Sequence, residues 1–231
     1  MEVKKLKQSI EDYRSFLKKD RDFRHRYIWE SLQTFQTNWD IDAPDFAAMF
    51  NRSFENTTSR RLWKREAWLP KEMMLKLINT DQEFVRRMFK DLKDESKELE
   101  GRISRFKFGC DTLLLDYKKR KATTIENNHF HEDNEMIFLY LSFLFPDKYT
   151  LFQYNDFLKV NEKLATPILP GPYDLIRFVK ITKIFHTFLQ KDEELKAANE
   201  RRLSGGLEGI AASQLLVFDF YASFANGFVI K

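Results

Sequence analysis

Residues 95–120 read ESKELEGRISRFKFGCDTLLLDYKKR, and this stretch decides the fold class. Its apolar residues recur at steps of three and four, which is the period of a helix with one buried face. They are Leu99, Ile103, Phe106, Cys110, Leu113, Leu114 and Tyr117. The stretch ends in cations, which stabilise the C-terminal end of a helix. We therefore expect one long amphipathic helix over roughly this range.

The same helical period recurs along the whole chain. Val3, Leu6 and Ile10 begin an N-terminal helix, and we expect Pro44 in the first turn of a helix over 44–54. Pro70 is expected to open another helix, and Asp81 to cap the next one. Strand signals are nearly absent, and FANGFVI (224–230) is the best of them. The sequence predicts an all-α protein, an irregular multi-helix bundle of about ten helices.

Composition indicates a globular chain, and its length suits one large domain or two small ones; we prefer a single helical domain over residues 1–231. Hydrophobic residues make up 43% and charged residues 32% of the chain, and only seven Gly and six Pro are present. The polar segment KATTIENN (121–128) is the expected place of a soft subdivision, and ATPILPGP (165–172) is the clearest loop.

One cysteine, Cys110, excludes an internal disulfide framework and leads us to expect a reducing cytoplasm. The N-terminus is charged from the start and shows no apolar signal region. The most apolar stretch is GIAASQLLVFDFYASFANGFVI (209–230), which Gln214, Asp219 and Asn226 interrupt. We expect a buried C-terminal helix there and no membrane anchor.

Familiar catalytic motifs are absent, so we expect neither enzymatic activity nor a cofactor. The chain has no GxxxxGK[ST], HExxH or GxSxG, and one cysteine cannot form a zinc site built from two cysteine pairs. Cys110 lies on the predicted apolar face of its helix, where a core role is favoured over a nucleophile.

NNHFHEDNEM (127–136) brings His129 and His131 together with three acids, and it has two interpretations. In an extended segment both imidazoles would point the same way and could bind one metal ion. As the start of a helix, the segment would place its acids in the first turn, where the helix dipole favours them. We favour the helix start and keep the metal site as a minority hypothesis.

The run SRRLWKREAW (59–68) is the candidate nucleic-acid interface. Arg and Lys neutralise phosphates and Trp stacks on unpaired bases; the candidates are Arg60, Arg61, Trp63, Lys64 and Arg65, followed by Arg86 and Arg87. Residues 1–120 hold 27 Lys and Arg against 21 Asp and Glu, which permits a polyanionic partner. The alternative is a solvated face with Trp63 in the core. The run around His25, KDRDFRHRYIWESL (19–32), allows the same two interpretations.

Four segments carry a resemblance to a known family: RRLWKREAWLPKEMM (60–74), RFKFGCDTLLLDYKK (105–119), NNHFHEDNEMIFLYLSFLFPDKYTLFQYNDF (127–157) and RFVKITKIFHTFLQKDEEL (177–195). Together they resemble the N-terminal helical region of large bacterial AAA+ proteins similar to the GTPase subunit of the 5-methylcytosine-specific restriction enzyme. The resemblance implies an all-helical module ahead of a nucleotide-driven motor that works with a separate nuclease subunit. This sequence lacks Walker motifs, so GTP hydrolysis is not assigned to it.

From these observations we expect a non-enzymatic targeting module of a restriction-like system that contacts DNA through the basic–aromatic run. Its expected partners are DNA and an AAA+ motor domain or nuclease subunit. The alternative is a protein-assembly domain that docks a partner subunit through its apolar C-terminal helix.

Overall fold

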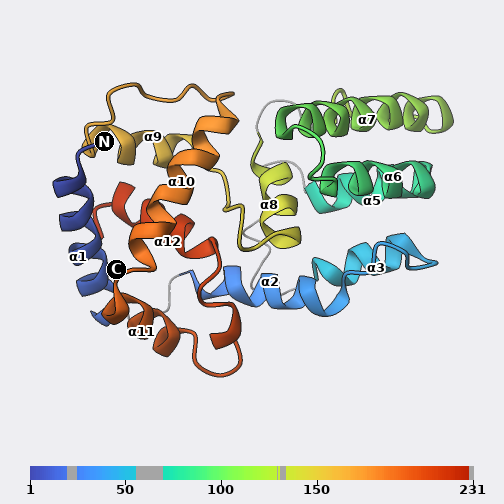
Figure 1. Ribbon diagram of the computed structural model, residues 1–231. Helices are drawn as coiled ribbons and strands as arrows, with labels where there is room; N and C mark the ends of the chain where they lie inside the picture. Colours follow the sequence, from blue (N-terminus) through green and yellow to red (C-terminus); the bar gives the residue numbers. More distant parts are fainter. Residues whose placement is uncertain (20–24, 56–69, 129, 131–133, 229–231) are drawn as a thin grey trace. The chain divides into compact units, whose positions relative to one another are not determined.

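The computed structural model describes residues 1–19, 25–55, 70–128, 130 and 134–228. In these residues the chain forms eleven α-helices and one 3-10 turn, and it contains no strand (Figure 1). The prediction of an all-α multi-helix protein is therefore confirmed. FANGFVI does not form a strand in its described part, since helix and turn continue through Phe228.

The helices pack as two compact units. Unit 1 contains Met1–Trp29 and Phe145–Lys231, and unit 2 contains Glu30–Leu144. The boundaries fall inside one helix and directly after another, away from the polar segment at 121–128 where a subdivision was expected. Local sequence signals mark loops, and they carry no information about a unit that is assembled from both ends of the chain.

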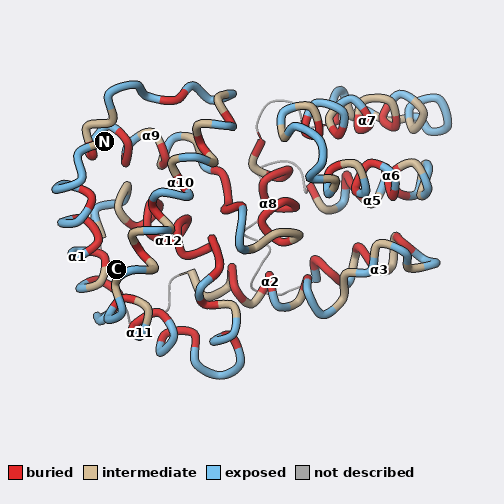
Figure 2. Tube along the Cα trace, in the orientation of Figure 1, coloured by how far each residue is buried: buried red, intermediate tan, exposed pale blue. Residues whose placement is uncertain are grey.

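Unit 1 is built around its last helix. Its helices are α1 (Val3–Lys19), the first turn of α2 (Arg26–Asn38), α9 (Tyr154–Lys163), α10 (Leu175–Leu189), α11 (Glu193–Arg202), the 3-10 turn η1 (Glu208–Ile210) and α12 (Leu215–Ala225). Helix α12 packs against α1, α9 and α10, and α1 also packs against α11. Every residue from Leu215 to Ser223 is buried (Figure 2).

The burial of α12 bears on the expected docking surface. A helix that is apolar on all sides belongs in a core, and α12 is covered within unit 1 by the helices just named. A partner could not contact its apolar side chains unless unit 1 opened. The expected burial of this helix is confirmed, and the surface that the assembly alternative requires is not exposed on it.

Unit 2 contains the rest of α2, α3 (Phe46–Ser53), α5 (Pro70–Thr80), α6 (Gln82–Lys93), α7 (Leu99–Arg120) and α8 (Glu135–Leu144). Helix α7 is the long helix predicted from residues 95–120. Aromatic rings fill the core where α3, α6, α7 and α8 meet. Phe89 lies at the centre, with ring centroids 5.2 Å from Phe106 and 5.2 Å from Tyr140, and Phe50 lies 4.8 Å from Phe54.

Aspartates begin four of the helices. The carboxylates of Asp45, Asp81, Asp174 and Asp192 each accept a hydrogen bond from the backbone N–H three residues ahead, at 2.8 to 3.2 Å. The prediction that Asp81 caps a helix is confirmed. The prediction for Pro44 is wrong, because α3 begins at Phe46 and Asp45 takes the capping position.

No helix in the described ranges combines the length and the apolar composition that crossing a bilayer demands.

Candidate functional site

The expected basic–aromatic interface lies mostly outside the described residues. Arg60, Arg61, Trp63, Lys64 and Arg65 belong to the segment 56–69, of which the structure describes nothing. Arg86 and Arg87 lie on α6 in unit 2, and the structure places these two neighbours in different environments.

Arg86 was predicted to contact nucleic acid, but it is 8% exposed. Its guanidinium donates to the carbonyl oxygens of Ile41 and Ala43, the latter at 2.9 Å, and its Nε lies 3.2 Å from the Glu83 carboxylate. The same group lies over the Phe46 ring, 5.0 Å from its centroid. Arg86 therefore joins the turn before α3 to α6, and its donors are already used by the fold.

Arg87 is exposed and pairs with no carboxylate among the described residues. Its guanidinium lies 5.6 Å from the centroid of the Phe84 ring on the preceding turn of α6. A cation over an aromatic ring keeps its charge and its outer donors. Of the two α6 arginines, Arg87 is the one whose charge faces solvent.

The C-terminal end of α7 carries more exposed cations. Lys118 donates to the carbonyl of Glu126 at 2.7 Å, and Arg120 donates to the carbonyl of Thr80 at 2.8 Å. Carbonyl oxygens satisfy donors but leave the positive charge unbalanced. Thr80 directly precedes Asp81, the N-cap of α6, so the basic end of α7 lies beside the start of α6.

Other cations of unit 2 are neutralised by its own acids. Lys90 lies 2.7 Å from Asp42, and both Lys97 and Arg105 contact Asp91, at 2.6 and 2.8 Å. The hydrogen bond from Lys90 is the largest of the causes that lower the pKa of Asp42. Arg87, Lys118 and Arg120 differ from these three cations, because their described contacts are to an aromatic ring or to carbonyl oxygens.

His129 and His131 lie outside the described residues, so the minority metal hypothesis is not addressed by their geometry. The neighbouring Asn128 is buried, and its amide donates to the Asp111 carboxylate of α7. Helix α8 begins at Glu135, which lies in its first turn, while Glu132 and Asp133 lie outside the described residues. Within the described ranges, no group of three or more His, Cys, Asp or Glu side chains is arranged to hold a metal ion.

Cys110 is buried in the core side of α7, as its place on the apolar face predicts. Burial, with a smaller contribution from Asp111, raises the pKa of its thiol well above the usual value. A thiol in this state is a poor nucleophile.

A buried polar cluster in unit 1 was not predicted from the sequence. The Asp219 carboxylate of α12 accepts a hydrogen bond from the Tyr13 hydroxyl at 2.5 Å and contacts the Arg202 guanidinium at 2.6 Å. It also contacts the His25 imidazole through Nδ1. We call these four residues the Asp219 cluster.

Electrostatics keep the Asp219 carboxylate charged. Burial alone would raise its pKa, but the Arg202 guanidinium and the hydrogen bonds from His25 and Tyr13 outweigh burial and hold the pKa well below the usual range. Burial and the adjacent carboxylate together raise the pKa of Tyr13. The cluster is therefore a buried ion pair between Asp219 and Arg202, and Tyr13 and His25 contact the same carboxylate.

A second set of contacts surrounds Arg202. Its guanidinium contacts the Asn199 side-chain oxygen at 2.8 Å and lies 5.2 Å from the centre of the Trp29 ring. Arg26 in turn donates to the carbonyls of Arg202 and Ser204, both at 3.0 Å. The Asp219 cluster thus joins α1, α2, α11 and α12 inside unit 1.

The chemistry open to the Asp219 cluster is limited by this engagement. A carboxylate that binds Nδ1 of an imidazole orients the ring, as in acid–base pairs. Here the same carboxylate also binds Tyr13 and Arg202, and the His25 side chain is only 17% exposed. The arrangement suits holding four elements together.

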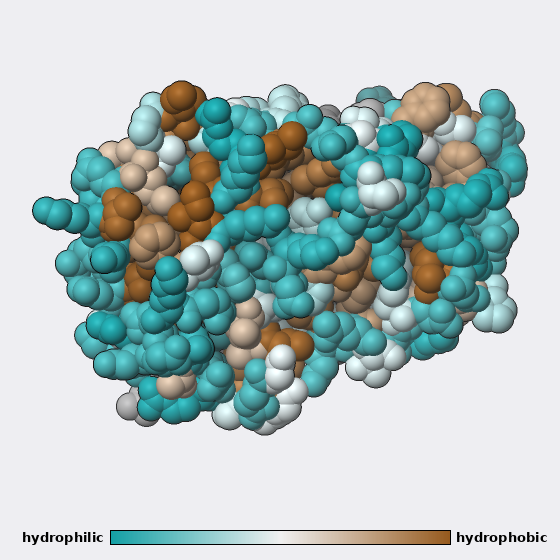
Figure 3. Space-filling model, viewed as in Figure 1, coloured by the Kyte–Doolittle hydropathy of each residue, from teal (hydrophilic) through white to brown (hydrophobic). Residues whose placement is uncertain are grey.

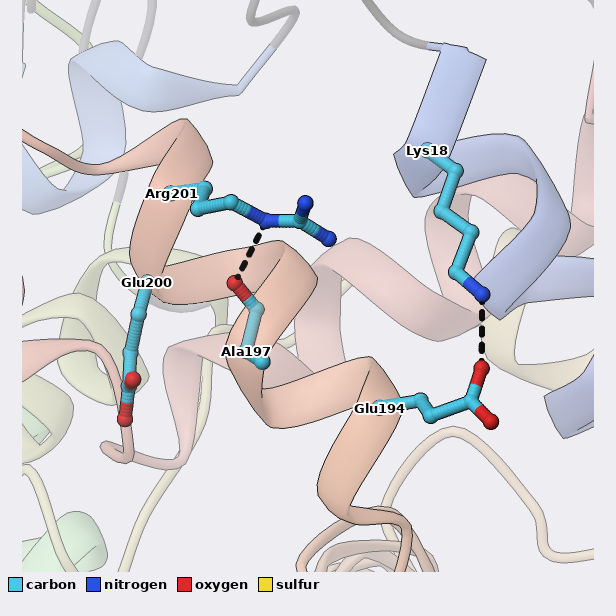
Figure 4. A pocket seen from close by; sticks show the side chains of 5 residues that line it. All are labelled: Lys18, Glu194, Ala197, Glu200 and Arg201. Carbon is cyan, nitrogen blue, oxygen red and sulfur yellow. Dashed lines mark hydrogen bonds and ion pairs between the residues drawn. The ribbon is translucent and has the colours of Figure 1, made fainter.

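A shallow pocket lies between the end of α1 and the outer face of α11 (Figure 4). It has a volume of about 450 Å³ and is lined by Lys18, Glu194, Ala197, Glu200 and Arg201. Lys18 and Glu194 form an ion pair of 2.6 Å across it. Four of its five lining residues are charged and none is aromatic, unlike the apolar and aromatic lining typical of organic-ligand sites.

In the sequence, Asp219 stands out only as an interruption of an apolar stretch, and His25 is isolated from the other histidines. A charged residue inside a helix of buried apolar residues needs a buried partner. The position of Asp219 in the sequence therefore indicated that such a partner exists. Nothing local identifies that partner, because Tyr13 and Arg202 lie 206 and 17 residues away in the chain.

Comparisons with protein-family models, with curated proteins and with solved structures give no match.

Proposed function

We propose that the chain is a non-enzymatic targeting module of a restriction-like AAA+ system and that it contacts DNA through cations of unit 2. The proposal rests on the basic–aromatic run at 59–68, on the resemblance in the sequence, and on the exposed cations of α6 and α7. In this proposal the module needs no cofactor, works in the cytoplasm, and acts beside a motor domain or nuclease subunit.

The observation that carries the proposal is the unbalanced charge at the end of α7. Lys118 and Arg120 are exposed, and the contacts described for them are to carbonyl oxygens. Lys121 lies over the Tyr117 ring, 5.9 Å from its centroid. Cations without an acid partner release more counterions from DNA than cations already paired, and they give affinity that depends on salt.

The contrast with paired cations gives a matched experiment. Binding of the full chain to methylated and unmodified duplexes is measured over a range of salt concentrations. We expect Arg60→Ala/Arg61→Ala and Lys118→Ala/Arg120→Ala each to weaken binding and to reduce the slope of log affinity against log salt by about 0.9 for each phosphate that is no longer neutralised. Lys90→Ala/Lys97→Ala removes two cations that unit 2 already neutralises, so it is expected to change little.

Absence of binding at low salt would contradict the proposal. Equal DNA affinity in all three double variants and in the unchanged chain would also contradict it. A preference for methylated duplexes would assign the reading of the modified base to this chain, and equal affinity for both duplexes would limit its role to backbone contact.

The assembly alternative expected a partner to dock on the apolar C-terminal helix, and the apolar side chains of that helix are buried in unit 1. Deleting residues 208–231 would remove the central helix of unit 1 and the Asp219 carboxylate with it. Loss of partner binding in such a truncated chain would reflect unfolding of unit 1 and not the removal of a docking surface. An assembly role therefore needs a different surface.

A further inference from the structure

Exposed apolar side chains gather on one part of unit 1. Eight large hydrophobic residues in the described ranges are exposed by 40% or more, and five of them lie between residues 168 and 184. They are Ile168, Leu169, Tyr173, Ile176 and Ile184. Figure 3 shows hydrophobic atoms on the face over α10 and over the loop before it. Concentrations of this kind mark interaction sites more often than single exposed residues do.

Helix α10 presents a continuous exposed stripe. At the helical period, its exposed residues occupy one side of the helix; they are Ile176, Lys180, Lys183, Ile184 and Thr187. The opposite side is buried in unit 1 and consists of Leu175, Phe178, Thr182, Phe185 and Leu189. Ile176 and Ile184 are eight residues apart, two turns along the same row, and the Lys180 stem lies between them.

The stripe carries positive charge that the described residues do not neutralise. Lys180 and Lys183 are exposed, and neither ammonium group pairs with a carboxylate within those ranges. The nearest acid along the chain, Asp174, caps α10 and pairs with Arg177 at 3.3 Å. The face therefore combines apolar contact area with two unpaired ammonium groups.

We propose that the exposed stripe of α10, with the loop 166–174, docks an acidic amphipathic helix of another protein chain. Rows of residues four apart are the ridges that pack into the grooves of a partner helix. Isoleucines at both ends of such a row supply the apolar contact, and the long lysine stems extend it. Carboxylates spaced between the apolar residues of the partner would meet Lys180 and Lys183.

Charge selects this occupant over two others. A second copy that docked through the same stripe would bring Lys180 and Lys183 against their own counterparts, which is repulsive. A lipid surface could not take up Ile176 and Ile184 without the lysines that lie among them, whereas membrane-surface helices keep cations on a separate polar face. A partner helix with alternating apolar and acidic positions avoids both difficulties.

Two synthetic peptides test the proposal with the full chain. One is a 20-residue helical peptide in which Leu recurs at alternating steps of three and four residues and Glu occupies the positions that flank this apolar face. The other peptide has the same composition in scrambled order. Binding is followed by fluorescence anisotropy. We expect the amphipathic peptide to bind and the scrambled one not to bind. Lys180→Glu/Lys183→Glu should weaken binding at least about tenfold, and a third peptide with Lys in place of Glu should then bind this variant.

Matched variants show whether peptide binding depends on the α10 stripe or on nonspecific apolar and charged contacts elsewhere on the chain. Ile176→Ala/Ile184→Ala should weaken binding, while Phe108→Ala/Leu115→Ala, which removes two exposed apolar residues of α7, should not. Lys4→Glu/Lys7→Glu reverses two exposed charges on α1 and serves as the charge control. Surface changes of this kind cost little stability, and circular dichroism checks that each variant is folded.

Four results would overturn the inference. They are no binding at about 1 mM peptide, equal binding of the scrambled peptide, equal loss in the control variants, and self-association that the Lys180→Glu/Lys183→Glu change abolishes. Binding to vesicles of phosphatidylglycerol and phosphatidylcholine that depends on Ile176 and Ile184 would assign the stripe to a lipid surface instead. None of these results depends on DNA binding, which is measured separately.

Discussion

The hydroxyl of Tyr13 donates a 2.5 Å hydrogen bond to the carboxylate of Asp219, although 206 residues separate the two along the chain. Tyr13 lies in the first helix of unit 1 and Asp219 in the last. Because Arg202 contacts the same carboxylate at 2.6 Å, one buried charge holds together helices from both ends of the chain.

Replacement of Asp219 by Asn should destabilise unit 1 strongly. The change leaves the buried Arg202 guanidinium without its counter-charge, and breaking a buried ion pair in this way costs about 3–5 kcal/mol. Tyr13→Phe removes one hydrogen bond to the carboxylate and should cost about 1.5–3 kcal/mol. Urea unfolding followed by circular dichroism measures both losses.

Asp116→Asn is the control for this change, because Asp116 pairs with Lys119 on the surface of α7. An exposed pair contributes at most about 1 kcal/mol. Equal unfolding free energies for Asp219→Asn and Asp116→Asn would show that the buried carboxylate does not hold unit 1 together.

Acid should unfold unit 1 partly through Asp219. The pKa of this carboxyl is lower in the folded chain than in the unfolded chain, so the unfolded state binds a proton first as the pH falls. The stabilisation is complete above about pH 5 and is lost as the pH falls through about 4 and below. The urea concentration at the unfolding midpoint, measured from pH 6 down to pH 2, should therefore decrease as the pH is lowered in the unchanged chain.

The pH effect is attributed to Asp219 by comparing slopes. Asp219→Asn should flatten the fall in the midpoint, provided that it still folds at pH 6. Surface acids with lowered pKa, such as Glu194, act in the same direction but are screened by salt. Parallel slopes for the two chains at about 0.5 M salt would rule out a major role for Asp219.

Adjacent arginines on α6 should behave differently. Arg86→Ala leaves the carbonyls of Ile41 and Ala43 without their donor, and we expect a loss of about 2–4 kcal/mol in unit 2. Arg87→Ala should change stability by less than about 0.5 kcal/mol. Thermal or urea unfolding of the two variants checks this difference, and an equal cost would contradict the assignment of Arg86 to the fold.

Two glycines of α7 give opposite predictions. A Cβ at Gly109 would lie 2.7 Å from Met88 Sδ and 3.0 Å from Met88 Cγ, so Gly109→Ala should push α6 and α7 apart and cost about 1–2 kcal/mol. A Cβ at Gly101 would meet only the flexible end of Arg105, at 3.1 Å, so Gly101→Ala should stabilise α7 by about 0.5–1 kcal/mol.

The unfolding free energies of the two alanine variants test whether the substitutions change stability in opposite directions. A stabilising Gly109→Ala would mean that Met88 moves aside without cost, and that the two helices need no glycine where they meet.

Local patterns predicted the helices well because their causes are local. The apolar period of α7, the capping carboxylate of Asp81 and the start of α5 at Pro70 all act within a few residues. The candidate site was harder to predict. Arg86 was predicted to contact nucleic acid, yet it lies three residues before the buried Phe89, on the side of α6 that faces the core.

Long-range relationships are the part that local patterns could not supply. The sequence marks Asp219 as a charge in an apolar helix, but Tyr13, His25 and Arg202 meet it only after the chain has folded. The exposed stripe of α10 was hidden for a related reason. On α10 the polar Thr182 is buried while the apolar Ile176 and Ile184 are exposed, so apolar character alone does not mark the buried side of this helix.

The division of unit 1 between both ends of the chain sets an order of events during synthesis. Unit 2 is complete once Leu144 has left the ribosome, whereas α1 must wait for α12, which begins at Leu215. At translation rates of about 5–20 residues per second, the roughly 200 residues between these helices take about 10–40 s to synthesise. Until α11 has been made the apolar face of α1 has no partner helix, and until α12 follows it is only partly covered. The nascent chain therefore carries an exposed helix that a chaperone could bind while unit 2 is already folded.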